Sequence, residues 1–275
     1  MNKMIVRIVA MFIITASVIA IVVTAATPAS APAQEAVIDN NEMTDEVETA
    51  PTVSLDNTPI LYTDVIYVPP LAYWDADNYI EANLYYINEM TDAINSGEYT
   101  DDAVAKMQGE IDRFKGINEL YKADMEKFER WDTEHYYASQ VWQFYRWRGF
   151  SPEVVAGILG NMMAETSGGS LNLKPTIYNP GRGYYGLCQW SLYYKPFMAD
   201  TDFDYQLSYL LEDMPIEFNN FGFCYKKNFT YEDFLALETP EDAALAFAKV
   251  YERCSSGSYG LRKSYARDAY EYFMA

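Results

Sequence analysis

The sequence predicts a mainly helical protein in which a helical hairpin precedes a compact domain with one small non-helical insertion. Three observations predict this class. Apolar residues recur at three- and four-residue spacing from residue 80 onward. Ser151-Pro152-Glu153 and Thr239-Pro240-Glu241 each combine a capping side chain, a proline at the first helical position and an acid in the first turn. Prolines and glycines gather in residues 171–190, which predicts loops and a small hairpin there.

Residues 1–33 have the layout of a targeting segment. Lys3 and Arg7 precede an uncharged run that ends at Ala26, and small residues follow in Ala31-Pro32-Ala33. This is the arrangement of a secretory signal peptide. The apolar part, residues 8–26, is also about as long as a short membrane span, so a retained N-terminal membrane anchor is the alternative. Both interpretations place the rest of the chain outside the cytoplasm, secreted or held at the cell envelope.

Residues 34–72 differ in composition from the rest of the chain. No Lys or Arg occurs between Arg7 and Lys106, and acidic residues and four prolines accumulate in this part. The composition predicts an acidic, extended linker. A solvated spacer is favoured over a specific interaction of an acidic tail.

Residues 73–132 predict an antiparallel helical hairpin or a short coiled coil. Ser96-Gly97 marks the turn, and Thr100 is the expected N-cap of the second helix. The first apolar series comprises Ile80, Leu84, Ile87 and Ile94; the second comprises Val104, Met107, Ile111, Phe114, Tyr121, Met125 and Phe128, with Asn118 as its polar exception. We expect a packing or oligomerisation element, with residues 75–130 as the surface for a helical partner. The second helix either continues through Tyr145 or restarts near Asp132-Thr133.

Residues 133–275 predict a compact and mostly helical domain. A first helix starts at Pro152 and stops at Ser167-Gly168-Gly169. After the irregular segment 171–190, further helices are expected near 203–213, 230–237, 240–253 and 261–273. Half of the 275 residues are hydrophobic, which is enough to bury a substantial core.

Charge and cysteine content exclude several function classes. A net charge of −20 argues against a nucleic-acid partner, because phosphate binding needs clustered Lys and Arg. Three cysteines, Cys188, Cys224 and Cys254, leave at least one thiol free, and a Cys224–Cys254 pair remains open. The chain has no C-x-x-C motif and one histidine, His135, so we expect neither a metal site nor a cofactor, and Cys–His or zinc peptidase chemistry is disfavoured.

One glutamate stands out in the helix that starts at Pro152. Val154, Ile158, Asn161 and Glu165 lie on one line of that helix, so Glu165 shares a stripe with core-directed residues. Burial and the negative end of the helix dipole both favour the protonated carboxyl, and a raised pKa suits a general acid. The alternative is a surface glutamate that leans into water.

Gly157 and Gly160 in the same helix each cost about 1 kcal/mol relative to alanine, a cost that is tolerated where another backbone comes close. The predicted neighbour is the segment 179–190, which combines aromatic rings with an amide, as sugar-binding clefts do. The substrate-binding candidates are Asn161, Tyr178, Tyr184, Tyr185, Gln189 and Trp190. The alternative is that Tyr184, Tyr185 and Trp190 are core residues.

Five segments, in this order, resemble the phage-tail lysozyme family. They read GFSPEVVAGILGNMMAET, YNPGRGYYGLCQWS, DFDYQLSYLLEDM, TPEDAALAFAKVYERC and RKSYARDAYEYF, and the resemblance covers residues 136–275. It implies a lysozyme-like α+β fold and cleavage of the β-1,4 bond between N-acetylmuramic acid and N-acetylglucosamine in peptidoglycan. Glu165 matches the family's catalytic acid, and Gln189 matches a glutamine that contacts substrate.

The chain departs from the family pattern in two places. Glu165 is followed by Thr166-Ser167-Gly168 instead of Ser-Gly, and Lys195 stands where an arginine usually follows the Gln-Trp unit. Asp200, Asp202 and Asp204 are candidates for a second carboxylate but are more typical of a helix start. With one acid alone, the acetamido group of the sugar could attack and give lytic transglycosylation. The alternative function is a catalytically weak or inactive module for cell-wall binding or assembly.

Overall fold

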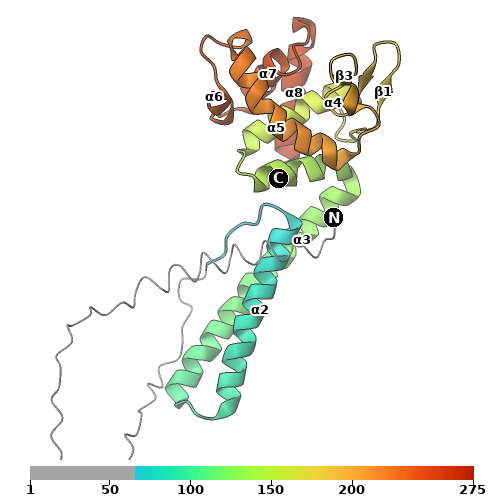
Figure 1. Ribbon diagram of the computed structural model, residues 1–275. Coiled ribbons are helices and arrows are strands. Elements are labelled where there is room, and N and C mark those ends of the chain that lie inside the picture. Colours follow the sequence, from blue (N-terminus) through green and yellow to red (C-terminus); the bar gives the residue numbers. More distant parts are fainter. Residues whose placement is uncertain (1–65) are drawn as a thin grey trace, which may run out of the picture. The chain divides into compact units, whose positions relative to one another are not determined.

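The computed structural model describes residues 66–275 (Figure 1). The expected signal peptide or anchor, residues 1–33, and most of the expected linker lie outside the described residues. Within residues 66–275, no helix combines the length and the apolar character that a membrane crossing needs.

The first two helices of the described chain form an antiparallel pair. α2 (Tyr73–Ser96) ends at Gly97, whose φ of 70° is the left-handed conformation that favours glycine. α3 (Asp101–Trp147) begins after Thr100, whose side chain accepts a hydrogen bond from the backbone N–H of Ala103. Figure 1 shows α2 alongside the first part of α3. The contacts between them include a buried cluster made of Ile87, Met90, Met107, Ile111 and Phe114.

A buried amide pair lies inside this apolar seam. Asn83 Nδ2 donates to Asn118 Oδ1 over 2.7 Å, and both residues are buried. The polar exception in the apolar series is therefore satisfied by a partner on the facing helix. Such a pair favours one register of the hairpin, because any shift would leave two buried amides without partners.

α3 is interrupted at His135, where φ is −146° and ψ is 61°, far from helical values. Nδ1 of His135 lies 3.0 Å from Oδ1 of Asn172, and the imidazole meets the Tyr272 ring edge-on. The part of α3 after His135 contributes Ala138, Val141, Trp142 and Tyr145 to the core of the following domain. The chain thus stays helical to Trp147, with a local break close to the predicted restart.

The domain after the break is mainly helical with one small sheet, which confirms the predicted fold class. Its helices are α4 (Pro152–Thr166), α5 (Phe203–Phe221), α6 (Tyr231–Leu235), α7 (Pro240–Val250) and α8 (Tyr259–Met274). The strands β1 (Tyr178–Asn179), β2 (Tyr184–Tyr185) and β3 (Trp190–Ser191) form an antiparallel sheet in that order, with Tyr178 opposite Tyr185 and Tyr185 opposite Trp190.

α4 is the central helix of the domain. Ser151 caps it by accepting from the backbone N–H of Val154, and Pro152 occupies the first turn. Residues 154–163 are all buried. Apolar residues therefore occur on every side of the helix, and only its two ends are partly exposed.

The two glycines of α4 allow two neighbouring helices to approach its backbone closely. A Cβ on Gly157 would lie 2.5 Å from Cβ of Ala243 in α7, and one on Gly160 would lie 2.5 Å from the backbone nitrogen of Ala266 in α8. The close neighbours are therefore α7 and α8, and the prediction that the segment 179–190 fills this role was wrong. Within that segment, a Cβ on Gly186 would lie 2.5 Å from Oε1 of Gln206 in α5.

All three cysteines are free: Cys188 is buried, Cys254 is partly buried and Cys224 is exposed. The open possibility of a Cys224–Cys254 disulfide is not realised in this structure.

Candidate functional site

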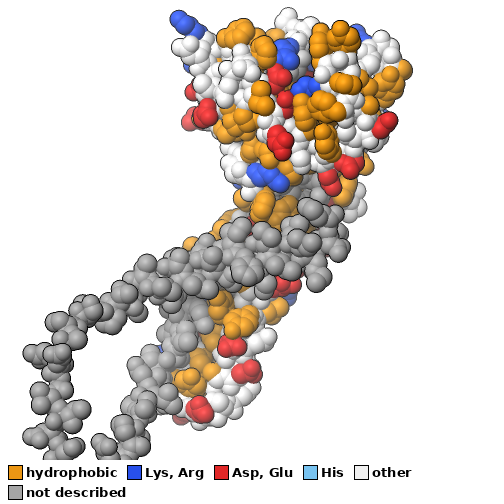
Figure 2. Space-filling model, viewed as in Figure 1, with side chains coloured by type: hydrophobic (Ala, Val, Ile, Leu, Met, Phe, Trp, Pro, Cys, Tyr) orange, Lys and Arg blue, Asp and Glu red, His pale blue; other side chains and the backbone are white. Residues whose placement is uncertain are grey.

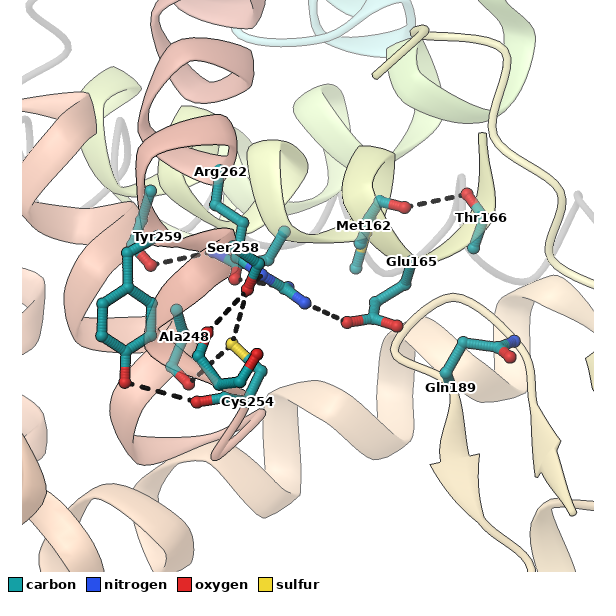
Figure 3. A network of polar contacts seen from close by, with 12 residues as sticks. Met162, Glu165, Thr166, Gln189, Ala248, Cys254, Ser258, Tyr259 and Arg262 are labelled. Carbon is teal, nitrogen blue, oxygen red and sulfur yellow. Dashed lines mark hydrogen bonds and ion pairs between the residues drawn. The ribbon is translucent and has the colours of Figure 1, made fainter. Parts of the chain in front are cut away.

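Glu165 lies in the last turn of α4 with its side chain 20% exposed. Its Oε1 accepts a hydrogen bond from Nη2 of Arg262 on α8, and the two side chains also form an ion pair (Figure 3). The carboxyl group is therefore fixed by a partner from another helix, and does not simply lean into water.

Arg262 is itself held on several sides. It is buried, and its Nη1 donates to Oδ1 of Asn161 at 2.9 Å while its Nε donates to Oγ of Ser258 at 3.2 Å. Asn161 is in turn fixed because its Nδ2 donates to the carbonyl oxygens of Gly157 and Ala244. Asn161 and Glu165, which lie on the same face of α4, thus both accept hydrogen bonds from the Arg262 guanidinium. This contact sets the position of the Glu165 carboxyl.

The charge of Arg262 is maintained despite its burial. Desolvation lowers the pKa of a buried guanidinium, but the carboxyl groups of Glu252 and Glu165 outweigh it and raise the pKa above the usual value. Arg262 therefore places a full positive charge beside Glu165.

A second acidic side chain, Glu252, belongs to the same cluster. It lies two residues after the end of α7, and its Oε1 is buried with no hydrogen-bond partner among the described residues. Burial, with the charge of Glu165, raises the pKa of Glu252 well above its ordinary value, against the opposing charge of Arg262. Burial also raises the pKa of Cys188, and the negative charge of Glu252 adds to the effect. The thiol is therefore uncharged at neutral pH.

Neither Arg262 nor Glu252 was predicted as a site residue from the sequence. Both lie in segments that carry the family resemblance, YERC and RKSYARDAYEYF, and this location is the one signal that could have drawn attention to them. Both residues lie far from Glu165 in the sequence and resemble ordinary surface charges. The sequence alone therefore does not show that they belong to the same cluster as Glu165.

Gln189 lies in the turn between β2 and β3, close to the end of α4, as Figure 3 shows. Its φ of 44° is left-handed, and its Nε2 donates to the carbonyl oxygens of Ile177 and Gly186 at 3.2 and 3.0 Å. These bonds fix the amide on the hairpin. The side chain remains partly exposed, so a ligand at Glu165 would meet a prepositioned amide.

The other predicted substrate-binding residues divide into two groups. Trp190 and Tyr185 are buried: Trp190 Nε1 donates to the Tyr251 hydroxyl at 2.9 Å, and the Tyr185 hydroxyl donates to the Thr201 carbonyl at 3.1 Å. Asn161 is also buried, and its side chain accepts a hydrogen bond from Arg262. Tyr184 is half-buried and Tyr178 is 52% exposed, so these two rings remain for contact with a ligand.

Further aromatic rings surround the hairpin. In Figure 2, hydrophobic side chains gather over the end of the domain that carries β1 and β3. Just after β3, Tyr193 and Tyr194 are 85% and 78% exposed and meet edge-to-face. Exposed aromatic rings next to a fixed amide are the surface that pyranose rings prefer.

Lys195, the residue at the family's arginine position, is used within the protein. Its Nζ lies 2.6 Å from Oδ2 of Asp213 and donates to the Tyr209 hydroxyl. Asp213 also accepts from the Tyr251 hydroxyl, which links this pair to Trp190. Lys195 therefore ties the end of the hairpin to α5.

The acidic residues near the start of α5 occupy helix-start positions. Asp202 is the N-cap and accepts from the backbone N–H of Tyr205 at 2.8 Å, and Asp204 lies in the first turn. Asp200 has a left-handed φ of 58° in the preceding turn. Within residues 66–275, no three His, Cys, Asp or Glu side chains lie close enough together to bind a metal ion.

These features define a class of protein. A mainly helical domain whose buried central helix ends in a fixed carboxyl group, beside a small antiparallel sheet, has the lysozyme-like fold. A family model described as phage tail lysozyme matches residues 137–273, and this domain belongs to that family. No curated protein and no solved structure matches the chain significantly. Membership assigns the domain a peptidoglycan-lytic function of the lysozyme type, that is, a glycosidase with peptidoglycan as substrate.

Proposed function

We propose that the domain cleaves the β-1,4 bond between N-acetylmuramic acid and N-acetylglucosamine, with Glu165 as general acid. The observation that carries the proposal is the position of the Glu165 carboxyl, held by the buried Arg262 at the open end of α4 and next to the hairpin of Gln189. The contact with Arg262 supports a Glu165 carboxyl that is fixed in space, and its place at the end of α4 supports access by a ligand.

In the proposed step, the protonated Glu165 gives its proton to the glycosidic oxygen while the bond from that oxygen to C1 breaks. The leaving sugar departs as an alcohol, and an oxocarbenium-like centre develops at C1. Attack by water gives a reducing end. Attack by a hydroxyl group of the same sugar, assisted by its acetamido group, gives an anhydro end and is lytic transglycosylation. The two products differ by one water.

The hairpin would bind the glycan. Gln189 can hydrogen-bond a sugar substituent, and Tyr178 and Tyr184 can lie against the apolar faces of pyranose rings. Tyr185, Trp190 and Asn161 support the site from inside: the first two fix the sheet, and Asn161 fixes Arg262.

We also propose that the protein acts outside the cytoplasm, where peptidoglycan lies, with residues 1–33 as the signal or residues 8–26 as a retained anchor. The paired α2 and α3 then serve as a spacer or as the surface for a helical partner through residues 75–130. The exposed Leu84, Tyr85 and Leu120 of this pair support the second role.

Zymography on purified cell walls tests the proposal. Glu165→Gln keeps the shape of the side chain and removes the acid, so clearing should fall by about 10²- to 10⁴-fold. Glu212→Gln, an exposed glutamate on α5, is the matched control and should clear normally. Undiminished clearing by Glu165→Gln would overturn the assignment of Glu165.

Two further measurements define the activity. Mass spectrometry of the released muropeptides distinguishes reducing ends from anhydro ends. A wild-type protein that sediments with sacculi but releases no muropeptides would favour the alternative function, a wall-binding module.

A further inference from the structure

The segment 191–195, which we call the tyrosine turn, presents two neighbouring aromatic rings to solvent. Tyr193 and Tyr194 are 85% and 78% exposed, and their rings meet edge-to-face with centroids 4.9 Å apart. Neither ring belongs to the buried core of the domain. Two exposed rings that touch each other form an apolar patch that core packing does not account for, and such a patch suits a ligand.

The backbone of the tyrosine turn is closed by its own hydrogen bonds. The N–H groups of Tyr194 and Lys195 both donate to the Ser191 carbonyl, at 3.1 and 2.8 Å. The N–H of Leu192 donates to the Gly183 carbonyl at 2.8 Å, which ties the turn to the connection between β1 and β2. The two exposed rings therefore project from a backbone with a defined conformation.

Both ends of the tyrosine turn are anchored to one buried carboxylate, Asp213 of α5. Just before the turn, Nε1 of Trp190 donates to the Tyr251 hydroxyl at 2.9 Å, and this hydroxyl donates to Oδ2 of Asp213 at 2.8 Å. At the last residue of the turn, Nζ of Lys195 donates to the same oxygen at 2.6 Å. Because the support is rigid, the rings lose little conformational entropy when they bind a ligand.

The tyrosine turn continues the surface of the hairpin that carries Gln189. Gln189 directly precedes β3 and the turn follows it, while Tyr184 of β2 lies opposite Ser191, the first residue of the turn. Gln189 and Tyr193 are four positions apart, so their Cα atoms lie at most about 14 Å from each other. A glycan strand of a few sugars can therefore contact the amide and the two rings together.

The charges around the tyrosine turn favour an uncharged ligand. Lys195 is the one Lys or Arg in residues 183–225, and its ammonium group is already paired with Asp213. The same residues contain six acidic side chains, namely Asp200, Asp202, Asp204, Glu212, Asp213 and Glu217. This charge repels an anionic wall polymer such as a polyphosphate chain. Pyranose rings need no charged partner, because their apolar faces lie against aromatic rings.

We propose that Tyr193 and Tyr194 form a further glycan-binding site, in which their rings contact N-acetylhexosamine units of the peptidoglycan strand beyond those at Gln189. The inference rests on the proposed function for the identity of its ligand. The site lies away from the bond that is cleaved, so it contributes to the binding of long strands and not to the chemical step.

Equilibrium binding of a soluble sugar tests the proposal. The probe is a β-1,4-linked hexamer of N-acetylglucosamine, titrated into the full chain carrying Glu165→Gln. Adding Tyr193→Ala and Tyr194→Ala together should raise Kd by about ten- to a hundredfold, because two ring contacts are lost. Adding Tyr193→Phe and Tyr194→Phe instead keeps both rings, so Kd should stay within about threefold.

Tyr136→Ala is the matched control. Tyr136 on α3 is 54% exposed and also meets a neighbouring tyrosine, Tyr137, edge-to-face, but it lies outside the tyrosine turn. Its Kd should equal that of the parent chain. All the variants should keep the parent's urea unfolding curve, because the replaced side chains are exposed, so a raised Kd reports on binding and not on folding.

A second readout separates binding from chemistry. In the chain with Glu165 intact, the double alanine variant should raise KM on cell walls and leave kcat within about twofold. An unchanged Kd for the hexamer, or a loss with phenylalanine as large as that with alanine, would overturn the proposal. An unchanged Kd together with a loss of dimers in sedimentation would assign the rings to a contact with a second copy of the chain instead. Full clearing by Glu165→Gln would overturn the proposed function while the Kd comparison still stands, so the two failures are distinguishable.

Discussion

Arg262 lies 97 residues beyond Glu165 in the chain, yet its guanidinium donates directly to the Glu165 carboxyl. The last helix of the domain therefore completes a site that begins at the end of α4. This relationship makes the geometry of Glu165 depend on how closely α4 and α8 pack.

Arg262→Lys should impair activity more than stability. An ammonium group can neutralise Glu165, but it cannot reach Asn161, Ser258 and Glu165 at the same time as the planar guanidinium does. We expect kcat/KM to fall by about 10²-fold because the acid is misplaced, a size of effect known for small displacements. Arg262→Ala should also reduce the free energy of unfolding by about 3 kcal/mol, since it leaves a partly buried carboxylate without its partner.

Arg267→Lys is the matched control for this experiment. Arg267 lies on the same helix, its side chain is 52% exposed, and its Nε lies 3.7 Å from Glu241. Both the rate and the urea unfolding curve should remain those of the wild type. A lysine at position 262 with wild-type kcat/KM would contradict a positioning role for the guanidinium.

Gly160→Ala should destabilise the domain although alanine is the better helix former. The new Cβ would lie 2.5 Å from the Ala266 nitrogen and 2.7 Å from the Arg262 carbonyl oxygen, so α4 and α8 must separate. Overpacking of this kind costs about 1–3 kcal/mol. Gly116→Ala in the exposed face of α3, where the Cβ meets nothing within 4 Å, should instead stabilise by about 1 kcal/mol. Urea unfolding of the two variants measures both changes in the free energy of unfolding. Changes of the same sign in the two variants would contradict this prediction.

The features predicted well from the sequence are those encoded by neighbouring residues. The Ser151-Pro152-Glu153 start of α4, the Thr100 cap and the Ser96-Gly97 turn all depend on local chemistry, and the structure has each of them. Glu165 was singled out because helix periodicity places it on a buried stripe. In contrast, Glu252 and Arg262 could not be found this way, because α7 and α8 fold back onto α4 through long-range packing. The neighbours of Gly157 and Gly160 were misassigned for the same reason: a close approach is visible in the sequence, but its partner is not.

The buried amide pair of the hairpin should behave as a unit. Replacing Asn118 with Leu leaves the Asn83 amide buried without its partner, which costs about 1–3 kcal/mol. The double variant Asn83→Leu/Asn118→Leu should recover most of this loss or exceed wild-type stability, while it weakens the choice of register. Urea unfolding of the single and double variants measures the coupling, and strictly additive losses would show that the amides do not depend on each other.

Glu252 should make the stability of the protein fall as pH rises. In the unfolded chain a glutamate titrates near pH 4.3, whereas burial beside Glu165 raises the pKa of Glu252 in the native state. Below the unfolded value both states hold the proton and the residue has no pH effect. Above it, the native state binds more protons than the unfolded state, so the free energy of unfolding decreases by up to about 1.4 kcal/mol per pH unit until the native pKa is reached.

Glu252→Gln lacks this titration and isolates its contribution. The stability of the variant relative to wild type should therefore rise as the pH increases above about 4.3, the pKa of an unfolded glutamate, measured as the difference in urea unfolding free energy. Glu271→Gln, exposed on α8, should show a difference that stays constant over the same range. A constant difference for Glu252→Gln as well would mean that the native carboxyl ionises normally despite its burial, and that the negative charge is neutralised within the cluster by Arg262 alone.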